Sequence, residues 1–465
     1  MLFNTPQFFA FLAIVLILFY AAPRGLRKYI LLAASYFFYM SWIPKFILLL
    51  LTLTVIDYAA ARWIARTESP RSRKVALIVS LSANLGLLGF FKYYNFFAAN
   101  IAHLLDKPEN TYAHSIILPL GISFHTFQSM SYVIDVYRRE QKPIVNPIDY
   151  ALFISFFPQL VAGPIVRARE FFADLYHWHA PNSEEVLRGL LLVILGLAKK
   201  MVMADQFAQV ANTYFKDVTG HPGLLTAWSG VVAFGIQIYF DFSGYTDMAI
   251  GMALLLGFHF PVNFRRPYLA SSITDFWHRW HMSLSRWLRD YLYIPLGGNR
   301  NGRLMTYRNL MLTMLLGGLW HGASWNFVVW GGYHGALLSI ERMFGLKRAP
   351  EENRWTLLYP LRAILAFALA MFGWVFFRAV NFHDSIYVLD QMFSGQIGSM
   401  FLMRWQIDLA LITLVLALLE EKLAWFEKLA VGPAWAYGAV CALLLLSVEL
   451  LGYTEAAVPF VYFQF

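Results

Sequence analysis

The chain has 465 residues, of which 59% are hydrophobic and only 14% are charged. Soluble domains are typically about 45–50% apolar and about 25% charged, so this composition excludes an ordinary water-soluble globular protein. The net charge of +9 does not indicate nucleic-acid binding, because the basic residues gather in short stretches between apolar segments.

Apolar segments recur from one end of the chain to the other, and a membrane-spanning helix needs about 20 mainly apolar residues. The segments are Phe8–Ala22, Phe46–Ala61, Val75–Phe91, Ile116–Val136, Leu187–Ala204, Leu224–Phe242, Leu357–Phe377, Ile407–Leu419 and Ala434–Leu451. They predict an all-α polytopic membrane protein with about 11 transmembrane helices and additional re-entrant or interfacial helices. We find no internal repeat or linker, so we expect one integral membrane domain over residues 1–465.

The basic residues also predict the orientation of the first helices. They follow the first, third and fifth predicted spans, at Arg24–Lys28, Arg62–Lys74 and Arg138–Lys142. The positive-inside rule then places these loops in the cytoplasm and the N-terminus outside. The first segment has no basic leader or cleavage site, so we expect it to be a span and not a removable signal peptide. A single cysteine, Cys441, excludes an intrachain disulfide.

The segment Tyr150–Ile165 is short and interrupted by Pro158, Gly163 and Pro164. We expect a re-entrant or broken helix, which a membrane protein tolerates only where protein or a water-filled cavity covers the freed backbone.

The stretch Ser271–Arg300 has the pattern of an amphipathic helix at the membrane interface. Its apolar face carries Trp277, Trp280, Leu284, Trp287, Leu288 and Tyr291, and its polar face carries Asp275, Arg279, Ser283, Arg286 and Asp290. The arginines suit interface anchoring, and they suit equally a donor that carries phosphate groups. Ser271, Ser272 or Thr274 is expected to cap it.

The run "GGLWHGASWNFVVWGGYHG" (Gly317–Gly335) places His321 in an apolar stretch without charged residues. Burial keeps an imidazole neutral, and a neutral imidazole is a usable general base. The alternative is a histidine that packs and hydrogen-bonds across a helix interface. The glycines four residues apart indicate close helix packing or a tunnel wall. Trp320 or Asn326 is a candidate donor to an oxyanion.

Other polar residues allow alternatives. His278 and His281 are three apart, but no cysteine and few carboxylates lie nearby, so we predict no metal site. The membrane-depth residues His125, Asp135, Asp241 and Asp247 are structural partners of Arg or His, or they form the ion pathway of a transporter. The chain lacks the inverted repeats that many transporters show.

Taken together, the motifs resemble those of the membrane-bound O-acyltransferase family, most of all its bacterial branch that serves alginate and related polysaccharides. The motifs are "LPLGISFHTFQSMSYVIDVYR" (118–138), "FFPQLVAGPIVR" (156–167), "IYFDFSGYTDMAIG" (238–251), "FRRPYLASSITDFWHRWHMSLSRWLRDYLYIPLGGNR" (264–300), "LWHGASWNFVVWGGYHG" (319–335), "FGWVFFRA" (372–379) and "FVYFQF" (460–465). They occur in order over nearly the whole chain.

The resemblance implies roles for three residues. The essential histidine of the family matches His321, and its second polar position, near the cytoplasmic mouth of a tunnel, matches His281. In the related teichoic-acid D-alanylation system, a separate small protein ends in a motif similar to "FVYFQF", which makes Tyr462 a candidate acyl relay. An aromatic tail packed at the membrane interface is the alternative.

The resemblance also implies the reaction and its surroundings. It implies no bound cofactor, acetyl-CoA as the donor, a polysaccharide acceptor outside the cell, and an extracytoplasmic SGNH-type acetyltransferase as partner, at the bacterial inner membrane. We expect Trp280, Arg279 and Arg286 to line the donor path. Peptidoglycan O-acetylation and teichoic-acid D-alanylation are alternatives, and an ion-coupled transporter is an alternative of another class.

Overall fold

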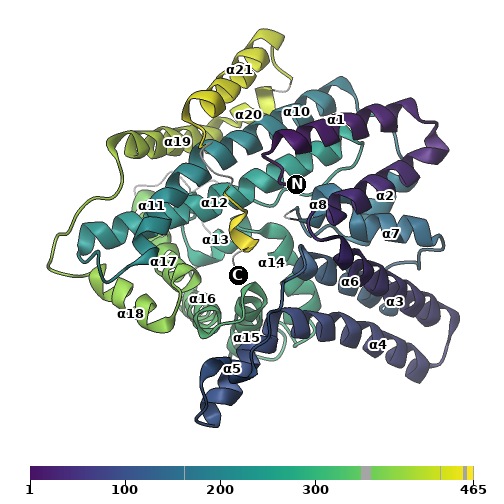
Figure 1. The fold of residues 1–465 in the computed structure, drawn as a ribbon, viewed down its shortest axis with the longest axis horizontal. Coiled ribbons are helices and arrows are strands. Elements are labelled where there is room, and N and C mark those ends of the chain that lie inside the picture. Colours follow the sequence, from purple (N-terminus) through teal and green to yellow (C-terminus); the bar gives the residue numbers. More distant parts are fainter. Residues whose placement is uncertain (162, 347–357, 430, 454–457, 464–465) are drawn as a thin grey trace. The chain divides into compact units, whose positions relative to one another are not determined.

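The chain is helical throughout the part that the structure describes (Figure 1). The computed structural model describes residues 1–161, 163–346, 358–429, 431–453 and 458–463, and no strand forms within these ranges. The residues group into two units. Unit 1 comprises Met1–Leu190 and Met248–Pro261, and unit 2 comprises Leu191–Asp247 and Val262–Phe465. The single domain expected over the whole chain stays a prediction.

Unit 1 contains the helices of the first part of the chain. They are α1 (Pro6–Ala21), α2 (Arg24–Met40), η1 (Pro44–Phe46), α3 (Ile47–Arg66), α4 (Pro70–Leu88), η2 (Gly89–Tyr93), α5 (Tyr94–Leu104), η3 (Glu109–Tyr112), α6 (Ile122–Tyr137), α7 (Pro147–Ser155), α8 (Phe157–Leu160) and α9 (Ala168–Tyr176). The chain passes from one unit to the other within α10 (Ser183–Ala198) and returns within α12 (Leu224–Leu255).

Unit 2 contains the remaining helices. They are η4 (Lys199–Ala204), α11 (Asp205–Lys216), η5 (Pro267–Leu269), α13 (Ile273–Arg279), α14 (Met282–Leu288), η6 (Arg289–Tyr293), α15 (Arg303–His321), α16 (Trp325–Met343), α17 (Tyr359–Arg378), α18 (Phe382–Gln391), α19 (Arg404–Leu423), α20 (Trp425–Leu429), α21 (Ala434–Leu451) and η8 (Val461–Phe463).

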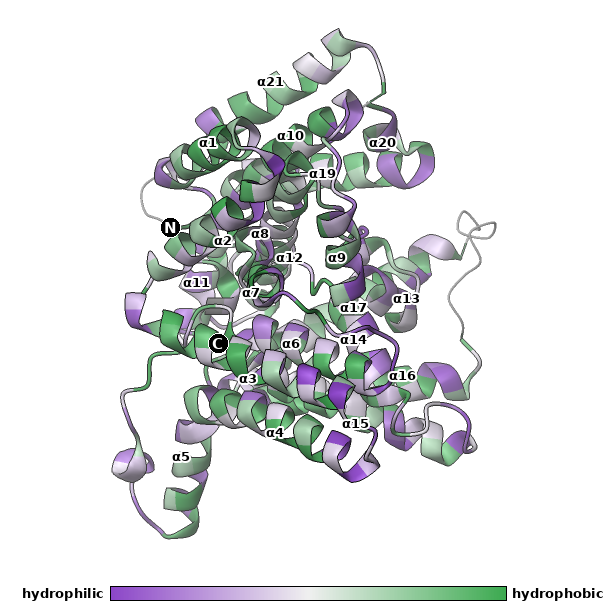
Figure 2. Cartoon of the chain, turned by 90° about the vertical axis from the view of Figure 1, so that its right-hand side faces the viewer, coloured by the Kyte–Doolittle hydropathy of each residue, from purple (hydrophilic) through white to green (hydrophobic). Residues whose placement is uncertain are grey.

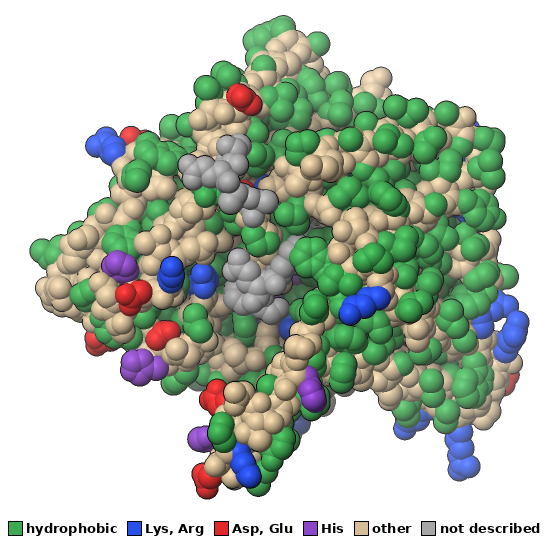
Figure 3. All heavy atoms as spheres, in the orientation of Figure 1, with side chains coloured by type: hydrophobic (Ala, Val, Ile, Leu, Met, Phe, Trp, Pro, Cys, Tyr) green, Lys and Arg blue, Asp and Glu red, His purple; other side chains and the backbone are tan. Residues whose placement is uncertain are grey.

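The apolar segments of the sequence form helices, as predicted. Among the described residues, 5 helical stretches are long and apolar enough to cross a membrane: Pro44–Arg66, Pro70–Leu104, Leu224–Leu255, Tyr359–Arg378 and Ala434–Leu451. In the hydropathy colouring of Figure 2, α1 and α21 are mainly hydrophobic, and much of the face in Figure 3 consists of hydrophobic side chains. The all-α polytopic fold is therefore confirmed, while the number of about 11 spans stays a prediction.

The broken helix predicted at Tyr150–Ile165 is confirmed. Helix α7 ends at Ser155, and the short α8 begins two residues later. The backbone groups at the break bond to buried side chains: the N–H of Phe157 donates to Ser35 Oγ at 3.1 Å, and Gln128 donates to the carbonyl of Phe153 at 3.1 Å. Protein thus covers the freed backbone, which is the condition for such a break at membrane depth.

The single amphipathic helix predicted at Ser271–Arg300 is wrong in one respect, because the structure divides it. Ser272 caps α13, as expected, by accepting from the N–H of Asp275 at 3.0 Å. The helix stops at Arg279, and His281 takes the left-handed conformation with φ 41° before α14 begins. Both faces of this stretch are buried in protein, so helical periodicity did not reveal a membrane-facing side.

Candidate active site

Helices α15 and α16 pack closely through the glycines of the run that contains His321. A Cβ on Gly318 would overlap the carbonyl oxygen of Phe327, and one on Gly331 would overlap the carbonyl oxygen of Met314. Only residues without a side chain allow this separation, as the glycine spacing predicted. The contact fixes His321, the last residue of α15, in the interior of unit 2.

His321 lies in a buried aromatic cluster. Its side chain is 4% exposed, and its ring centroid lies 5.0 Å from that of Trp320, 5.2 Å from Phe377 and 5.6 Å from Tyr462. These residues come from α15, α17 and the C-terminal tail. The structure therefore brings His321 and Tyr462 together, although they stand 141 positions apart in the sequence. Both residues were predicted to take part in the same reaction.

His281 belongs to the same cluster. Its ring lies 4.7 Å from Phe242 and 6.3 Å from Trp320, and Phe242 in turn lies 4.7 Å from Tyr462. The five rings form a closed circuit in which each contacts the next: His281, Phe242, Tyr462, His321 and Trp320. All three residues proposed as catalytic thus share one buried site.

Asn263 holds His281 in its strained conformation. Its Oδ1 lies 3.3 Å from Nδ1 of His281 and accepts from the N–H of Ser283 at 3.0 Å, and its carbonyl accepts from the N–H of Met282 at 2.9 Å. A left-handed backbone on a residue other than glycine costs about 1–3 kcal/mol and is concentrated at functional sites. The break between α13 and α14 is therefore built to present the imidazole.

Burial sets the protonation states of His281 and Tyr462, which lie outside the candidate membrane spans. It lowers the pKa of His281 to about 3 and raises the pKa of the Tyr462 phenol above its usual range. At neutral pH His281 is therefore a neutral imidazole, and the Tyr462 phenol keeps its proton until a base removes it.

A buried carboxylate holds the tail that carries Tyr462. The N–H of Val461 donates to Asp241 Oδ2 at 2.6 Å, and Phe460, which is fully buried, packs on Tyr245 at 4.9 Å between ring centroids. The Tyr462 hydroxyl is buried and has no hydrogen-bond partner within the described ranges. Gln464 and Phe465, the last two residues of the tail motif, lie outside the described residues.

Asp241 has a lysine partner inside unit 2, which it shares with Asp205. Lys200 lies 2.8 Å from Asp241 and 2.7 Å from Asp205, and the Lys200 side chain is fully buried. Asp247 pairs in the same way with Lys199 at 2.6 Å. Both aspartates have structural partners, as one of the two interpretations predicted, but the partners are lysines and not the predicted Arg or His. A lysine within the apolar segment Leu187–Ala204 was the signal that sequence reasoning passed over.

The three residues predicted to line the donor path lie in unit 2, and their roles stay predictions. The Arg279 guanidinium is buried and bonded to Asp275 at 3.1 Å and to Glu421 at 2.9 Å. Trp280 packs against Trp374 at 4.9 Å between ring centroids. Arg286 is half-buried on α14. The basic face of this stretch is thus largely neutralised within the protein.

The remaining candidates are also placed. The amide of Asn326 donates to the carbonyl of Ala379 at 3.0 Å, which ties α16 to the end of α17. Trp320 contacts both histidines and is the better placed of the two candidate oxyanion donors. His278 is exposed whereas His281 is buried, so the two point into different surroundings. His334 packs between Trp277 and Trp330.

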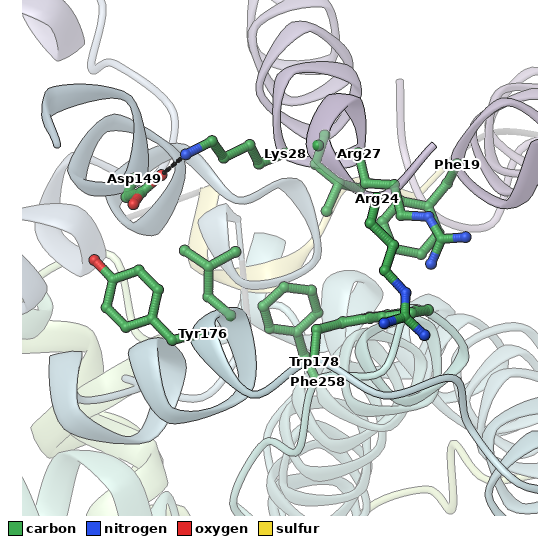
Figure 4. A pocket seen from close by; sticks show the side chains of 11 residues that line it. Phe19, Arg24, Arg27, Lys28, Asp149, Tyr176, Trp178 and Phe258 are labelled. Atoms are coloured by element: carbon green, nitrogen blue, oxygen red, sulfur yellow. Dashed lines mark hydrogen bonds and ion pairs between the residues drawn. The ribbon is translucent and has the colours of Figure 1, made fainter. Parts of the chain in front are cut away.

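Unit 1 contains a separate pocket of about 400 Å³ with a basic wall (Figure 4). Arg24, Arg27 and Lys28 line one side, and Lys28 bonds to Asp149 at 2.7 Å. The Arg27 guanidinium lies over the Trp178 ring at 4.3 Å. None of the residues proposed as catalytic lines it, because all three of them lie in the aromatic cluster of unit 2.

Comparisons with known proteins test the resemblance to a family. A family model described as MBOAT, membrane-bound O-acyltransferase family, matches residues 76–380. The chain is 43% identical over 402 residues to "Probable alginate O-acetylase AlgI" of Azotobacter vinelandii, covering 85% of this chain and 78% of that protein. It is 41% identical over 425 residues to "Peptidoglycan O-acetyltransferase" of Helicobacter pylori, covering 84% and 80%.

A more distant relative is "Teichoic acid D-alanyltransferase" of Bacillus subtilis, 30% identical over 308 residues, covering 62% of this chain and 75% of that protein. The matched residues 76–380 contain both histidines of the cluster and most of the helices that surround them. The chain therefore belongs to the membrane-bound O-acyltransferase family and is a multi-pass membrane O-acyltransferase.

Proposed function

We propose that the chain moves an acetyl group from a cytoplasmic thioester, acetyl-CoA, to the hydroxyl groups of an extracytoplasmic polysaccharide such as alginate. The observation that carries the proposal is the contact of the His321 and Tyr462 rings at 5.6 Å within the buried cluster. A base next to a buried hydroxyl is the arrangement that acyl transfer requires. The names of the similar O-acetylases support acetyl as the group that is moved.

The reaction proceeds as two ester exchanges. His321 takes the proton of the Tyr462 hydroxyl while the oxygen attacks the thioester carbonyl, and a donor such as Trp320 stabilises the oxyanion. The carbon–sulfur bond breaks, and the thiolate that leaves takes the proton from His321. An acceptor hydroxyl then attacks the Tyr462 ester while His321 takes its proton. The bond between the acetyl carbon and the Tyr462 oxygen breaks, and the phenolate that leaves takes that proton from His321.

The setting of this reaction is part of the proposal. The chain lies in the bacterial inner membrane with its N-terminus outside and the donor entering on the cytoplasmic side, where His281 stands nearer the entrance. An extracytoplasmic SGNH-type acetyltransferase receives the acetyl group and completes the transfer to the polysaccharide.

A labelled donor tests the relay. Purified chain incubated with radiolabelled acetyl-CoA and no acceptor is expected to carry label on Tyr462, identified in the C-terminal peptide by mass spectrometry. His321→Ala and Tyr462→Phe are expected to abolish this label, and His321→Ala to lower polysaccharide acetylation by about 10²–10⁴-fold because it removes the general base. Tyr333→Phe is the matched control, since its hydroxyl bonds to the carbonyl of Leu369 away from the cluster.

Two results would contradict the proposal. Full acetylation by Tyr462→Phe together with the partner would show direct transfer to the acceptor without a relay. Full acetylation by a folded, membrane-inserted His321→Ala variant would show that His321 is structural.

The acceptor needs its own experiment, because the relatives that act on alginate and on peptidoglycan are almost equally similar to this chain. Chain and partner are offered alginate, peptidoglycan fragments and teichoic acid in parallel, with acetyl-CoA as donor. We expect acetylation of alginate. Acetylation of peptidoglycan alone, or transfer only from a D-alanyl donor, would replace the proposal by one of its alternatives. Ion flux through reconstituted vesicles without acyl transfer would favour a transporter.

A further inference from the structure

Three potential metal ligands meet in unit 1, outside the catalytic cluster. His179 lies in the loop between α9 and α10, Glu185 in the first turn of α10, and His259 in the segment that follows α12. One ligand atom from each of the three lies within 4.8 Å of the others. Two imidazoles and one carboxylate are a frequent ligand set for Zn²⁺.

Asp174 orients the imidazole of His259. Its Oδ2 accepts from the backbone N–H of His259 at 2.6 Å, and its Oδ1 lies 3.2 Å from Nδ1 of the ring. A carboxylate beside Nδ1 favours the tautomer with the proton on Nδ1, which leaves the lone pair on Nε2. That Nε2 lies only 3.0 Å from Oε1 of Glu185. Two acceptors face each other at this distance only when a proton or a cation lies between them.

His179 shows the same arrangement at its own ring. Its Nδ1 lies 3.3 Å from the carbonyl oxygen of Ala180, which again favours the proton on Nδ1 and a lone pair on Nε2. A histidine that binds a metal typically donates its other N–H to a carboxylate or a backbone carbonyl. His259 has a carboxylate as this partner, that of Asp174, and His179 has a backbone carbonyl, that of Ala180.

The carboxylate of Glu185 is held in place by the cap of α10. Its Oε2 accepts from the N–H of Asn182 at 2.8 Å, while Asn182 Oδ1 accepts from the N–H of Glu185 at 2.9 Å. This capping box explains why a glutamate stands here. It does not explain why the second oxygen points at His259, which requires either a shared metal ion or the proton of an imidazolium between them.

We propose that His179, Glu185 and His259 bind a Zn²⁺ ion, with Asp174 as the outer-shell partner of His259. Ligands about 2.0–2.1 Å from a tetrahedral zinc ion lie a little over ~3 Å from one another, close to the separation of His259 and Glu185. His179 and His259 are exposed, so the ion exchanges with solution and its fourth position is open to water.

The metal joins two segments that also form the wall of the pocket in Figure 4. Trp178 and Phe258, the neighbours of the two histidines, line that pocket, and the indole N–H of Trp178 donates to the carbonyl of Leu256 at 2.8 Å. Hydrogen bonds already link the segments, including the one from the His259 N–H to Asp174 at 2.6 Å, and a metal ion shared by His179 and His259 would add a further cross-link. The ion therefore acts as a brace in unit 1 that acyl transfer itself does not use.

A proton is the competitor of the metal. Burial alone would lower the pKa of His259, but Glu185 and Asp174 outweigh it and raise the pKa. Without metal, the imidazolium between the two carboxylates is stable at low pH, and its contribution is lost as the pH rises through the raised pKa. The proton needs only His259 and its carboxylates, whereas the metal also needs His179. The dependence on His179 therefore separates the two.

The test measures zinc on the full chain purified in detergent. After EDTA treatment and dialysis against Zn²⁺ at pH 7.5, we expect one zinc per chain by elemental analysis and a higher melting temperature than for the metal-free protein. His179→Ala and His259→Ala are expected to weaken zinc binding by at least about 100-fold, and Asp174→Asn by about 10–100-fold. Glu185→Gln keeps the cap of α10 but removes the negative charge of the ligand, so zinc binding is expected to weaken while the helix start is preserved.

His177→Ala is the matched control, because His177 is an exposed histidine of the same loop outside the cluster. It is expected to keep the full zinc content. His259→Cys guards against a folding defect, since a thiolate replaces the imidazole as a ligand and zinc is expected to remain. Zinc bound equally by His177→Ala and His179→Ala, or no zinc retained by the unaltered chain, would overturn the proposal.

Discussion

At the scale of single residues, the candidate site depends on buried side chains from distant parts of unit 2 that hold one another in place by ion pairs and hydrogen bonds. Lys200, Asp205 and Asp241 carry charges in the interior, and Asp241 uses its second oxygen to hold the backbone of the tail. We infer that Asp241 is a positioning residue for Tyr462. It touches neither His321 nor the hydroxyl that we propose to react.

Asp241→Ala is expected to release the tail. It leaves the N–H of Val461 unsatisfied, which costs about 1–3 kcal/mol, so acetylation should fall about tenfold or more. Asp241→Asn, which still accepts the hydrogen bond, should retain more activity. In a Cys441→Ala background, Tyr462→Cys gives a thiol whose maleimide labelling should be slow, and Asp241→Ala should accelerate it.

Asp247→Asn is the control for the loss of a paired charge on the same helix, since Asp247 is half-buried, pairs with Lys199 and does not bond to the tail. The positioning role is wrong if both variants slow acetylation equally, or if labelling at position 462 is unchanged in Asp241→Ala.

The residues of the candidate site could be named from the sequence, where their roles stay predictions, but their arrangement could not. The residues around His321 left two interpretations open, a general base or a histidine that packs across a helix interface. Only the resemblance to the family favoured the general base. The link between Asp241 and Val461 spans 220 positions and uses a backbone N–H, which leaves no side-chain pattern to detect. The proposed zinc site could not be predicted from the sequence for a similar reason, because His259 stands 74 positions after Glu185 and belongs to no spaced motif.

At the scale of helices, the periodicity of apolar residues predicted where helices form. It did not predict where a helix breaks when protein surrounds the helix on every side. The Trp-rich stretch kept its helical spacing but broke at His281, because Asn263 and Glu421 supply partners that a 30-residue window does not contain. The glycine spacing predicted the α15–α16 contact correctly. There the constraint is local, since small residues are needed wherever two backbones touch.

Gly318→Ala is expected to force α15 and α16 apart. The added methyl group would overlap the carbonyl oxygen of Phe327, and such overpacking typically costs about 1–3 kcal/mol. Since His321 follows three residues later on α15, acetylation should fall together with the melting temperature in detergent.

Gly332→Ala is the matched control on the facing helix. Its methyl group would meet only the end of Leu315 at 3.6 Å, an ordinary van der Waals contact. We expect wild-type stability and activity from it. If the two variants behave alike, the close approach at Gly318 does not position His321.

At the scale of the whole chain, α21 and the tail have the properties of an attached module. Helix α21 has 18 residues and is apolar apart from Ser447 and Glu449, and Cys441 is its only buried residue. Specific bonds tie the tail that follows it: the N–H of Tyr453 donates to the carbonyl of Met201 at 3.1 Å, and Val461 bonds to Asp241. Lipid covers an exposed apolar helix, so its own insertion does not require the rest of the chain.

This arrangement predicts that the chain can be split before α21. Residues 1–431 alone are expected to insert into the membrane without acetylating polysaccharide, because Tyr462 is missing. Co-expression of residues 432–465 should restore acetylation, at a lower level than the intact chain because cutting removes the tether. The same fragment with Tyr462→Phe should restore nothing, whereas a fragment with Tyr437→Phe, altered on α21 itself, should restore it as well as the unaltered one. Activity of residues 1–431 alone would exclude the tail from the reaction, and two inserted fragments without activity would show that α21 must be covalently attached.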